Sequence, residues 1–126
     1  MRGPSRFARN EIGRAAERAA SRFLQARGCF LVECNYRCRM GEIDLIMRQG
    51  ATLVFYEVRY RARQDYGSGA ESVDARKQGK LVRAAQHYML TKAIAERYPV
   101  RFDVVDLRPG QHDFETHWIP NAFDNV

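Results

Sequence analysis

The segment GEIDLIMRQGATLVFYEVRYR, residues 41–61, decides the fold of this chain. Two largely apolar runs, 42–48 and 52–60, flank a short segment that contains a glycine, and this pattern predicts a β-hairpin. Acidic residues interrupt both runs, among them Asp44 and Glu57. Because burial of a carboxylate costs free energy unless another group compensates its charge, these acids need a physical explanation.

Side chains on a strand alternate between two faces, so Asp44 shares a face with Glu42. A two-residue turn at 49–50 would place Asp44 one diagonal step from Glu57, and a four-residue turn at 49–52 would place the two residues directly opposite each other. Both turns leave the two carboxylates on the same face of the hairpin, whereas a three-residue loop would separate them.

Two like charges on neighbouring strands repel each other, and partial burial adds the loss of their hydration. Two explanations remain open for Asp44 and Glu57. The first is a divalent cation, because Mg²⁺ is held by one or two carboxylates together with waters and substrate phosphates. The second is a structural ion pair with an arginine such as Arg59.

The rest of the chain alternates between helical and extended patterns. Further elements are predicted at 10–27 (helix), 29–36 (strand), 73–97 (helix ended by Pro99), 100–107 (strand) and 110–119 (turn and edge strand). Residues 1–9 are expected to form a flexible N-terminal arm. This order predicts a single α/β domain over residues 1–126, in which helices flank a mixed sheet of about five strands.

Composition and charge restrict the class of protein. The chain has 126 residues, 45% of them hydrophobic and 29% charged, which is enough for one globular core. The net charge is +6, but residues 102–126 contain five acids and one base, a net −4, which leaves +10 for residues 1–101. This basic body indicates a polyanionic partner, nucleic acid or an anionic membrane surface, or else charge that only confers solubility.

Other signals exclude several alternatives. No apolar run approaches the ~20 residues of a membrane span, and the basic N-terminal segment lacks the apolar core of a secretory signal. We therefore expect a cytoplasmic protein with no membrane partner. The three cysteines and three histidines match no zinc-site spacing, which argues against a metal bound through sulfur or nitrogen.

The predicted helix over 73–97 adds cations to the constellation. Lys77 lies within the apolar stripe that should pack on the sheet, so it must reach solvent or find an anionic partner. Arg76, Lys80 and Arg83 share an adjacent face that suits a phosphate backbone. Glu17 lies at the edge of the apolar stripe of the first helix, as an outer carboxylate of the site or as a solvated side chain.

Six segments occur in order along the chain: ERAASRFLQARG, NYRCRMGEIDLIM, LVFYEVRYR, SVDARKQGKLVRAAQHYML, RFDVV and NAF. In these segments the chain closely resembles the YraN family of uncharacterised bacterial proteins, over residues 10–123. That family is similar to the PD-(D/E)xK nuclease superfamily, and in particular to archaeal Holliday-junction resolvases. The resemblance implies a restriction-endonuclease-like fold with a phosphodiesterase site that depends on Mg²⁺ or Mn²⁺.

Carried over residue by residue, the resemblance implies a role for each acid. Asp44 resembles the metal-binding aspartate, Glu57 the glutamate of the (D/E)xK motif, and Glu17 the helix carboxylate of the first motif. Lys77 resembles the basic residue on the helix that follows the site. Glu42 belongs to the family's GEID string without an assigned role.

The motif departs from the superfamily at Arg59, where a lysine is expected. A guanidinium stays protonated at any accessible pH, so Arg59 cannot abstract a proton, although it can stabilise charge on a phosphate. Lys77 is an alternative carrier of the lysine's role.

These observations predict a nucleic-acid-binding protein with a nuclease-type fold, which would hydrolyse phosphodiester bonds of DNA, including branched or junction DNA. Arg76, Lys80 and Arg83 would position the backbone, and Arg61 and Arg63 could close over it from the segment 61–72. Two alternatives remain: a catalytically inactive DNA-binding module, which Arg59 favours, and a structural or scaffold domain. A homodimer is considered by analogy with junction resolvases, through Tyr66, Trp118 or Phe123.

Overall fold

The computed structural model describes residues 6–62, 73–94 and 97–123, with side chains from Glu11 onward. Its elements are α1 (Arg6–Gln25), β1 (Phe30–Cys38), β2 (Gly41–Gln49), β3 (Thr52–Tyr60), α2 (Ala75–Thr91), β4 (Val100–Pro109) and β5 (Phe114–Ile119). The strands form one sheet in the order β1-β2-β3-β4-β5, with β3 and β4 parallel and the other neighbours antiparallel. This confirms the predicted α/β class with a five-stranded mixed sheet, which is consistent with a restriction-endonuclease-like fold.

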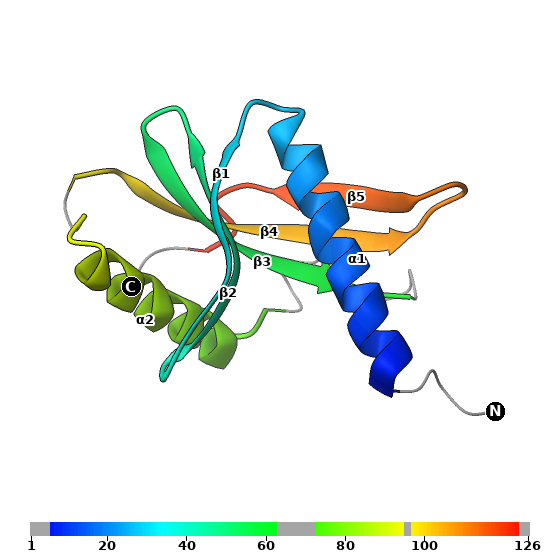
Figure 1. The fold of residues 1–126 in the computed structure, drawn as a ribbon, viewed down its shortest axis with the longest axis horizontal. Helices are drawn as coiled ribbons and strands as arrows, with labels where there is room; N and C mark the ends of the chain where they lie inside the picture. The colour runs from blue at the N-terminus through cyan, green and yellow to red at the C-terminus, as the bar shows by residue number, and fades with distance from the viewer. Residues whose placement is uncertain (1–5, 63–72, 95–96, 124–126) are drawn as a thin grey trace.

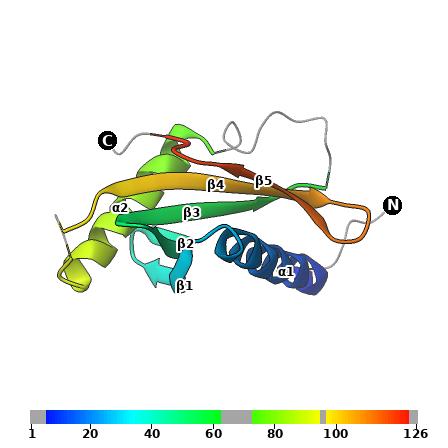
Figure 2. The same cartoon turned by 90° about the horizontal axis from the view of Figure 1, so that it is seen from above.

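The two helices cover different faces of the sheet (Figures 1 and 2), and each builds its own hydrophobic core. On α1, Ala16, Ala20 and Leu24 recur at helical spacing and are fully buried against one face. On α2, Leu81 and Tyr88 pack against the other face. Neither helix, in the part of the chain that the structure describes, has an apolar stretch long enough to cross a lipid bilayer.

Both helix boundaries differ from the sequence prediction. Helix α1 begins at Arg6, so residues 6–9 belong to it and not to an N-terminal arm. Helix α2 ends at Thr91, six residues before the predicted end. The chain reverses at Ala93, which has a left-handed φ of 54°, and Ile94 then packs against the core on the α2 side. The backbone N–H groups of Ala93 and Ile94 donate to Leu90 and Met89, so the helix is capped well before Pro99, which restricts only the residue before it.

The hairpin of β2 and β3 has one of the two predicted registers. Gln49 pairs with Thr52 around a two-residue turn in which Gly50 has a φ of 60°, and the ladder continues to the pair Leu45–Tyr56. One further step along this register brings Asp44 opposite Glu57, as in the four-residue-turn prediction. The other predicted register, with Asp44 one diagonal step from Glu57, is wrong because the turn lies one residue further along the chain.

Gly41 fixes the approach of the β1–β2 turn to α2. Its φ of 154° is one that residues with side chains rarely adopt. A Cβ atom at Gly41 would lie 3.5 Å from both the Cβ and the backbone oxygen of Lys80. The turn therefore packs closely on α2, and this brings the first residues of β2 next to the helix that carries Lys77.

Candidate functional site

Asp44 lies where the β2–β3 ladder ends. The backbone N–H of Val58 donates a hydrogen bond of 2.8 Å to Oδ2 of Asp44, so the carboxylate takes a backbone donor of β3 just beyond the last paired residues. Among the described residues, this is the one hydrogen bond that the Asp44 side chain accepts. Asp44 is partly buried, and one backbone N–H compensates the charge of its carboxylate only in part.

Glu57 lies opposite Asp44 on β3 and is only 6% exposed. Its Oε1 atom forms ion pairs with two cations: Nζ of Lys77 lies 2.7 Å away, and Nη1 of Arg59 lies 3.7 Å away. Lys77 is the third residue of α2, and its backbone N–H donates to the N-cap Asp74 at 2.9 Å. The start of the helix therefore brings the Lys77 ammonium to the sheet, where it finds the anionic partner that its apolar surroundings require.

A cavity of about 140 Å³ lies over these groups. It is lined by Gly41, Glu42, Asp44, Glu57, Lys77, Lys80 and Leu81. The walls come from β2, β3 and α2, so residues far apart in the sequence enclose the two opposed carboxylates. We call this space the carboxylate cavity.

The carboxylate cavity brings several acids close to Asp44. Burial, Glu57, Glu17 and Glu42 together raise the pKa of Asp44 to about 8, against the opposing hydrogen bond from Val58. Burial and Glu42 also raise the pKa of Glu17, while a side-chain hydrogen bond from Asn35 and the charge of Arg37 oppose that rise. Four carboxylates from α1, β2 and β3 thus share one field, and a further cation would favour their charged forms.

The donor set fits a hard divalent cation. Carboxylate oxygens suit Mg²⁺ and Mn²⁺, and Mg²⁺ usually takes one or two carboxylates together with waters and phosphates. Asp44 and Glu57 provide such a pair. Among the described residues, no group of three or more His, Cys, Asp or Glu side chains could hold a metal ion. Within the described part of the chain, a cation here would rely on the carboxylates of Asp44 and Glu57.

Comparison with known sequences identifies the family. The sequence profile described as "Uncharacterised protein family UPF0102" matches residues 16–107. The chain belongs to the UPF0102 family. This confirms the YraN resemblance, because YraN and UPF0102 are the same family.

Full-length relatives support this membership. A UPF0102 protein of Pseudomonas syringae pv. tomato is 47% identical over 125 residues, which cover 95% of this chain and 98% of the relative. One from Nitrosomonas europaea is 49% identical over 112 residues, or 89% and 92% of the two chains. One from Legionella pneumophila is 45% identical over 114 residues, or 90% and 95%. The names of these relatives state no activity, so UPF0102 membership does not assign one.

The cations predicted to contact nucleic acid fall into three groups in this UPF0102 protein. Arg76, Lys80 and Arg83 are exposed on α2, and Lys80 lines the carboxylate cavity. Arg61 instead forms a two-pronged ion pair with Asp106, with Nε at 3.2 Å and Nη2 at 3.1 Å, and its side chain is only 12% exposed. Arg63 lies outside the described residues.

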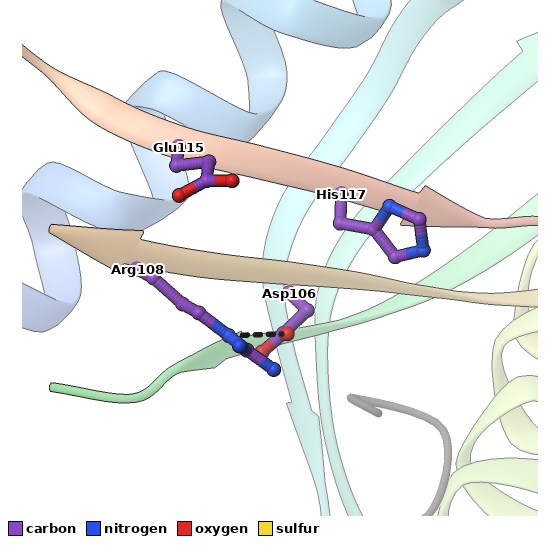
Figure 3. A pocket seen from close by; sticks show the side chains of 4 residues that line it. All are labelled: Asp106, Arg108, Glu115 and His117. Atoms are coloured by element: carbon purple, nitrogen blue, oxygen red, sulfur yellow. Dashed lines mark hydrogen bonds and ion pairs between the residues drawn. The ribbon is translucent and has the colours of Figure 1, made fainter. Parts of the chain in front are cut away.

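A second polar recess was not predicted from the sequence. It has a volume of about 280 Å³ and is lined by Asp106 and Arg108 of β4 and by Glu115 and His117 of β5 (Figure 3). Asp106 is 2% exposed and is paired with Arg61 and Arg108. The recess is larger than the carboxylate cavity, but its buried acid is already neutralised by arginines. In the sequence, this recess could have been suspected from Asp106, an acid in the largely apolar run VRFDVVDL, residues 100–107.

Sequence reasoning also missed one residue of β1 beside the candidate site. Nε of Arg37 lies 3.5 Å from Oε1 of Glu42. Arg37 belongs to no charged stripe and to no helical pattern. Its contact depends on the pairing of β1 with β2, in which Arg37 lies opposite Glu42.

Proposed function

We propose that this UPF0102 protein is a metal-dependent phosphodiesterase that acts on DNA, with Asp44 and Glu57 as ligands of Mg²⁺ or Mn²⁺. The observation that supports this most strongly is the direct opposition of the two carboxylates in the carboxylate cavity. Asp44 has one backbone donor, and its pKa is raised to about 8 by burial and by Glu57. A purely structural pair would be expected to carry more compensating donors.

The surrounding residues suit phosphate chemistry. When bound, the ion would supply an activated water and would polarise a phosphoryl oxygen. The Lys77 ammonium, 43% exposed and 2.7 Å from Glu57, is placed to contact a phosphate that enters the cavity and to stabilise developing negative charge. Arg59 carries a permanent charge at the same carboxylate and contributes electrostatically, without taking a proton.

The exposed cations of α2 favour a polyanionic substrate. Arg76, Lys80 and Arg83 recur at i, i+4 and i+7 on one face of the helix and extend from the mouth of the carboxylate cavity. Contacts of this kind neutralise phosphates and read no base sequence, so the proposal includes no sequence specificity. Linear, branched and junction DNA are all candidate substrates.

The decisive experiment is calorimetric titration of Mg²⁺ and Mn²⁺ into the wild type, Asp44→Asn and Glu57→Gln. We expect binding by the wild type and loss of binding in both variants. Cleavage of linear and four-way DNA is then measured with and without a chelator. Cleavage by a clean Asp44→Asn preparation that equals the wild type would refute the proposed chemistry.

Arg59 supports a second candidate function, a catalytically inactive DNA-binding module. Together with Lys77 it places two cations on Glu57, an arrangement that can neutralise this acid without a metal. This candidate predicts salt-dependent DNA binding that persists in chelator and yields no product. If salt-dependent DNA affinity is absent as well, the third candidate, a structural or scaffold domain, is favoured.

A homodimer is proposed only by analogy with junction resolvases. Of the contact residues considered, Tyr66 lies outside the described residues. Trp118 donates its indole N–H to Asp103, and Phe123 stacks on Phe102 with ring centroids 5.4 Å apart. Sedimentation of the free protein and of its DNA complex measures the stoichiometry directly.

A further inference from the structure

Gly79 lies inside α2, where a glycine weakens the helix. It is the fifth residue of the helix, and glycine in a helix interior is destabilising because it loses more backbone freedom on folding than any other residue. Glycine is useful at such a position when another group must approach the backbone closely. Packing of α2 on the sheet is not the reason here, because Gly79 is not among the buried residues of the helix.

The group that approaches Gly79 is the side chain of Arg83. Apart from the backbone of α2 itself, the atoms nearest to a Cβ placed at Gly79 are, among the described residues, Nη1 of Arg83 at 3.3 Å and its Cζ and Nη2 at 3.9 Å. The guanidinium therefore lies over Gly79, one turn back along the helix, which is the direction that long side chains take on a helix. A bulky side chain at position 79 would occupy the space that the guanidinium fills.

The helix backbone, and not an acid, holds Arg83 in this place. Other exposed arginines pair with carboxylates, as Arg37 does with Glu42 at 3.5 Å. Arg83 is exposed, and no ion pair is found for it among the described residues. Its guanidinium is therefore a positioned cation with which an anion from outside the chain can pair.

The position over Gly79 is continuous with the mouth of the carboxylate cavity. Arg83 leans toward the end of α2 that carries Lys80, which lines the cavity. Arg76 precedes Gly79 by three residues and Arg83 follows it by four, so the two cations flank the glycine on the helix surface. A phosphodiester backbone that leaves the cavity along this face would meet both cations.

We propose that Gly79 is a positioning residue for DNA binding: it lets the Arg83 guanidinium lie against α2, where the guanidinium contacts a backbone phosphate of the strand that enters the carboxylate cavity. The inference rests on the proposed function and deepens it. An arginine that is already held in the free protein loses less rotamer freedom on binding than a mobile one, so its contact with phosphate is stronger. Gly79 therefore weakens the helix and strengthens the contact with DNA.

The experiment measures affinity for a short DNA duplex by fluorescence anisotropy, at several salt concentrations, for the wild type, Gly79→Leu, Arg83→Gln and the double variant. Leucine is a good helix former and fills the space over position 79. Each single variant should bind about three-fold more weakly and lower the slope of log affinity against log salt by about 1, as for the loss of one phosphate contact. The double variant should be no weaker than Arg83→Gln alone, because Gly79 acts through Arg83.

Gly13→Leu is the matched control. Gly13 lies inside α1, and no atom of the described residues comes within 4 Å of a Cβ placed there. Both leucine variants replace a glycine in a helix interior, so both should raise the midpoint of thermal unfolding by about 4 °C. Only Gly79→Leu should also weaken DNA binding, and a more stable protein with a lower affinity distinguishes this role from damage to the fold. If leucine is not tolerated, Gly79→Ala repeats the test with a smaller loss in the same direction.

Three results would overturn this inference and leave the proposed function intact. They are wild-type DNA affinity in Gly79→Leu, an equal loss of affinity in Gly13→Leu, and a further loss from Gly79→Leu in the Arg83→Gln background, which would mean that the glycine acts on another group. Absence of salt-dependent DNA binding by the wild type would refute the proposed function, and this inference with it.

Discussion

Asp44 and Asp103 are both aspartates of the central sheet, but their surroundings differ. Asp103 is completely buried and accepts four hydrogen bonds, two from Arg101 (2.8 and 2.9 Å), one from the Trp118 indole and one from the backbone of Asn121 (both 2.9 Å). Asp44 accepts one, from Val58, and faces another carboxylate. Burial of an acid is thus no functional signal by itself. The informative quantity is the number of donors that compensate its charge.

The same contrast separates two regions of the molecule. The acids of β4, Asp103 and Asp106, are each matched by an arginine on their own or a neighbouring strand. In the carboxylate cavity, Glu42 and Glu57 pair with cations, whereas no ion pair is found for Asp44 among the described residues. We therefore interpret the acids of β4 as part of the framework and the carboxylate cavity as the site where a ligand completes the charge balance.

The largest expected effect tests the framework side of this comparison. Asp103→Ala leaves the partly buried Arg101 without its carboxylate and should lower the free energy of unfolding by about 3–5 kcal/mol, as for other broken buried ion pairs. Urea denaturation measures the change. Glu115→Ala, an exposed acid on β5, serves as the control and should stay within about 0.5 kcal/mol of the wild type. Equal effects of the two substitutions would mean that the burial and pairing of Asp103 contribute nothing beyond an exposed acid.

The next effect has the opposite sign. Because the pKa of Asp44 is raised to about 8 from an ordinary value of 3.8, the folded protein holds a proton that the unfolded chain releases between these pH values. The Asp44 contribution to stability therefore falls as the pH rises from about 4 to about 8. Asp44→Asn removes this decline and should stabilise the metal-free protein by up to about 6 kcal/mol at pH 9, less whatever water screens at this partly buried site, with no gain near pH 4.

Denaturant midpoints of the wild type and Asp44→Asn, measured from pH 4 to pH 9, check this prediction. A stability difference that does not change with pH would contradict the raised pKa. A destabilised variant at pH 9 would mean that Asp44 is compensated as fully as Asp103.

A smaller effect is expected at the cation that joins the two carboxylate strands to α2. Lys77→Ala removes the ammonium 2.7 Å from Glu57 and should lower stability by about 1 kcal/mol, since the half-exposed lysine is screened by solvent. The same substitution should strengthen Mg²⁺ binding, because the ion no longer competes with the ammonium for Glu57. The control is Lys80→Ala. Lys80 lines the cavity but has no ion pair with Glu57 among the described residues. No change in ion affinity would show that Lys77 does not shield Glu57.

The smallest effect concerns the exposed face of α2. Arg83→Gln should weaken DNA binding by less than ~1 kcal/mol and reduce the slope of log affinity against log salt by about 1, as for a single phosphate contact. Fluorescence anisotropy at several salt concentrations measures both. The control is Arg27→Gln, a cation just after α1 that lies over the Phe23 ring at 3.4 Å from its centroid. Equal losses at both positions would mean that the positive charge attracts DNA without a defined face.

Local patterns predicted the fold class and the shared face of Asp44 and Glu57. The alternation of apolar and acidic residues in 41–61 gave the hairpin, and its two registers both left Asp44 and Glu57 on one face. The choice between them depended on a one-residue shift of the turn to Gly50 and Ala51, which is too small a difference for a sequence pattern to resolve. Helix ends were less predictable, because α2 ends at a left-handed Ala93, a position that no glycine marks, and not near Pro99.

Groups that meet only through tertiary structure escaped prediction. Arg101 and Asp103 are two residues apart, but the Trp118 and Asn121 donors come from the far end of the chain. Tyr36 on β1 and His87 on α2 are likewise far apart in the sequence, and their hydrogen bond forms only in the folded chain. The groups that compensate the charge of a buried acid come together only in the folded chain. An aspartate in a strand therefore looks the same in the sequence whether it forms a structural ion pair or belongs to the candidate site.

The fluorescence of Trp118 should respond differently to changes in the two regions, the acids of β4 and the carboxylate cavity. Trp118 is the only tryptophan of the chain, and it packs with the core on the α1 side while it donates to Asp103. Its fluorescence emission therefore reports the surroundings of Asp103 and changes when this part of the sheet unfolds. The carboxylate cavity opens toward α2, on the other side of the sheet. An ion that binds there should leave the tryptophan spectrum almost unchanged, so the intrinsic fluorescence of this protein follows unfolding and is silent on occupancy.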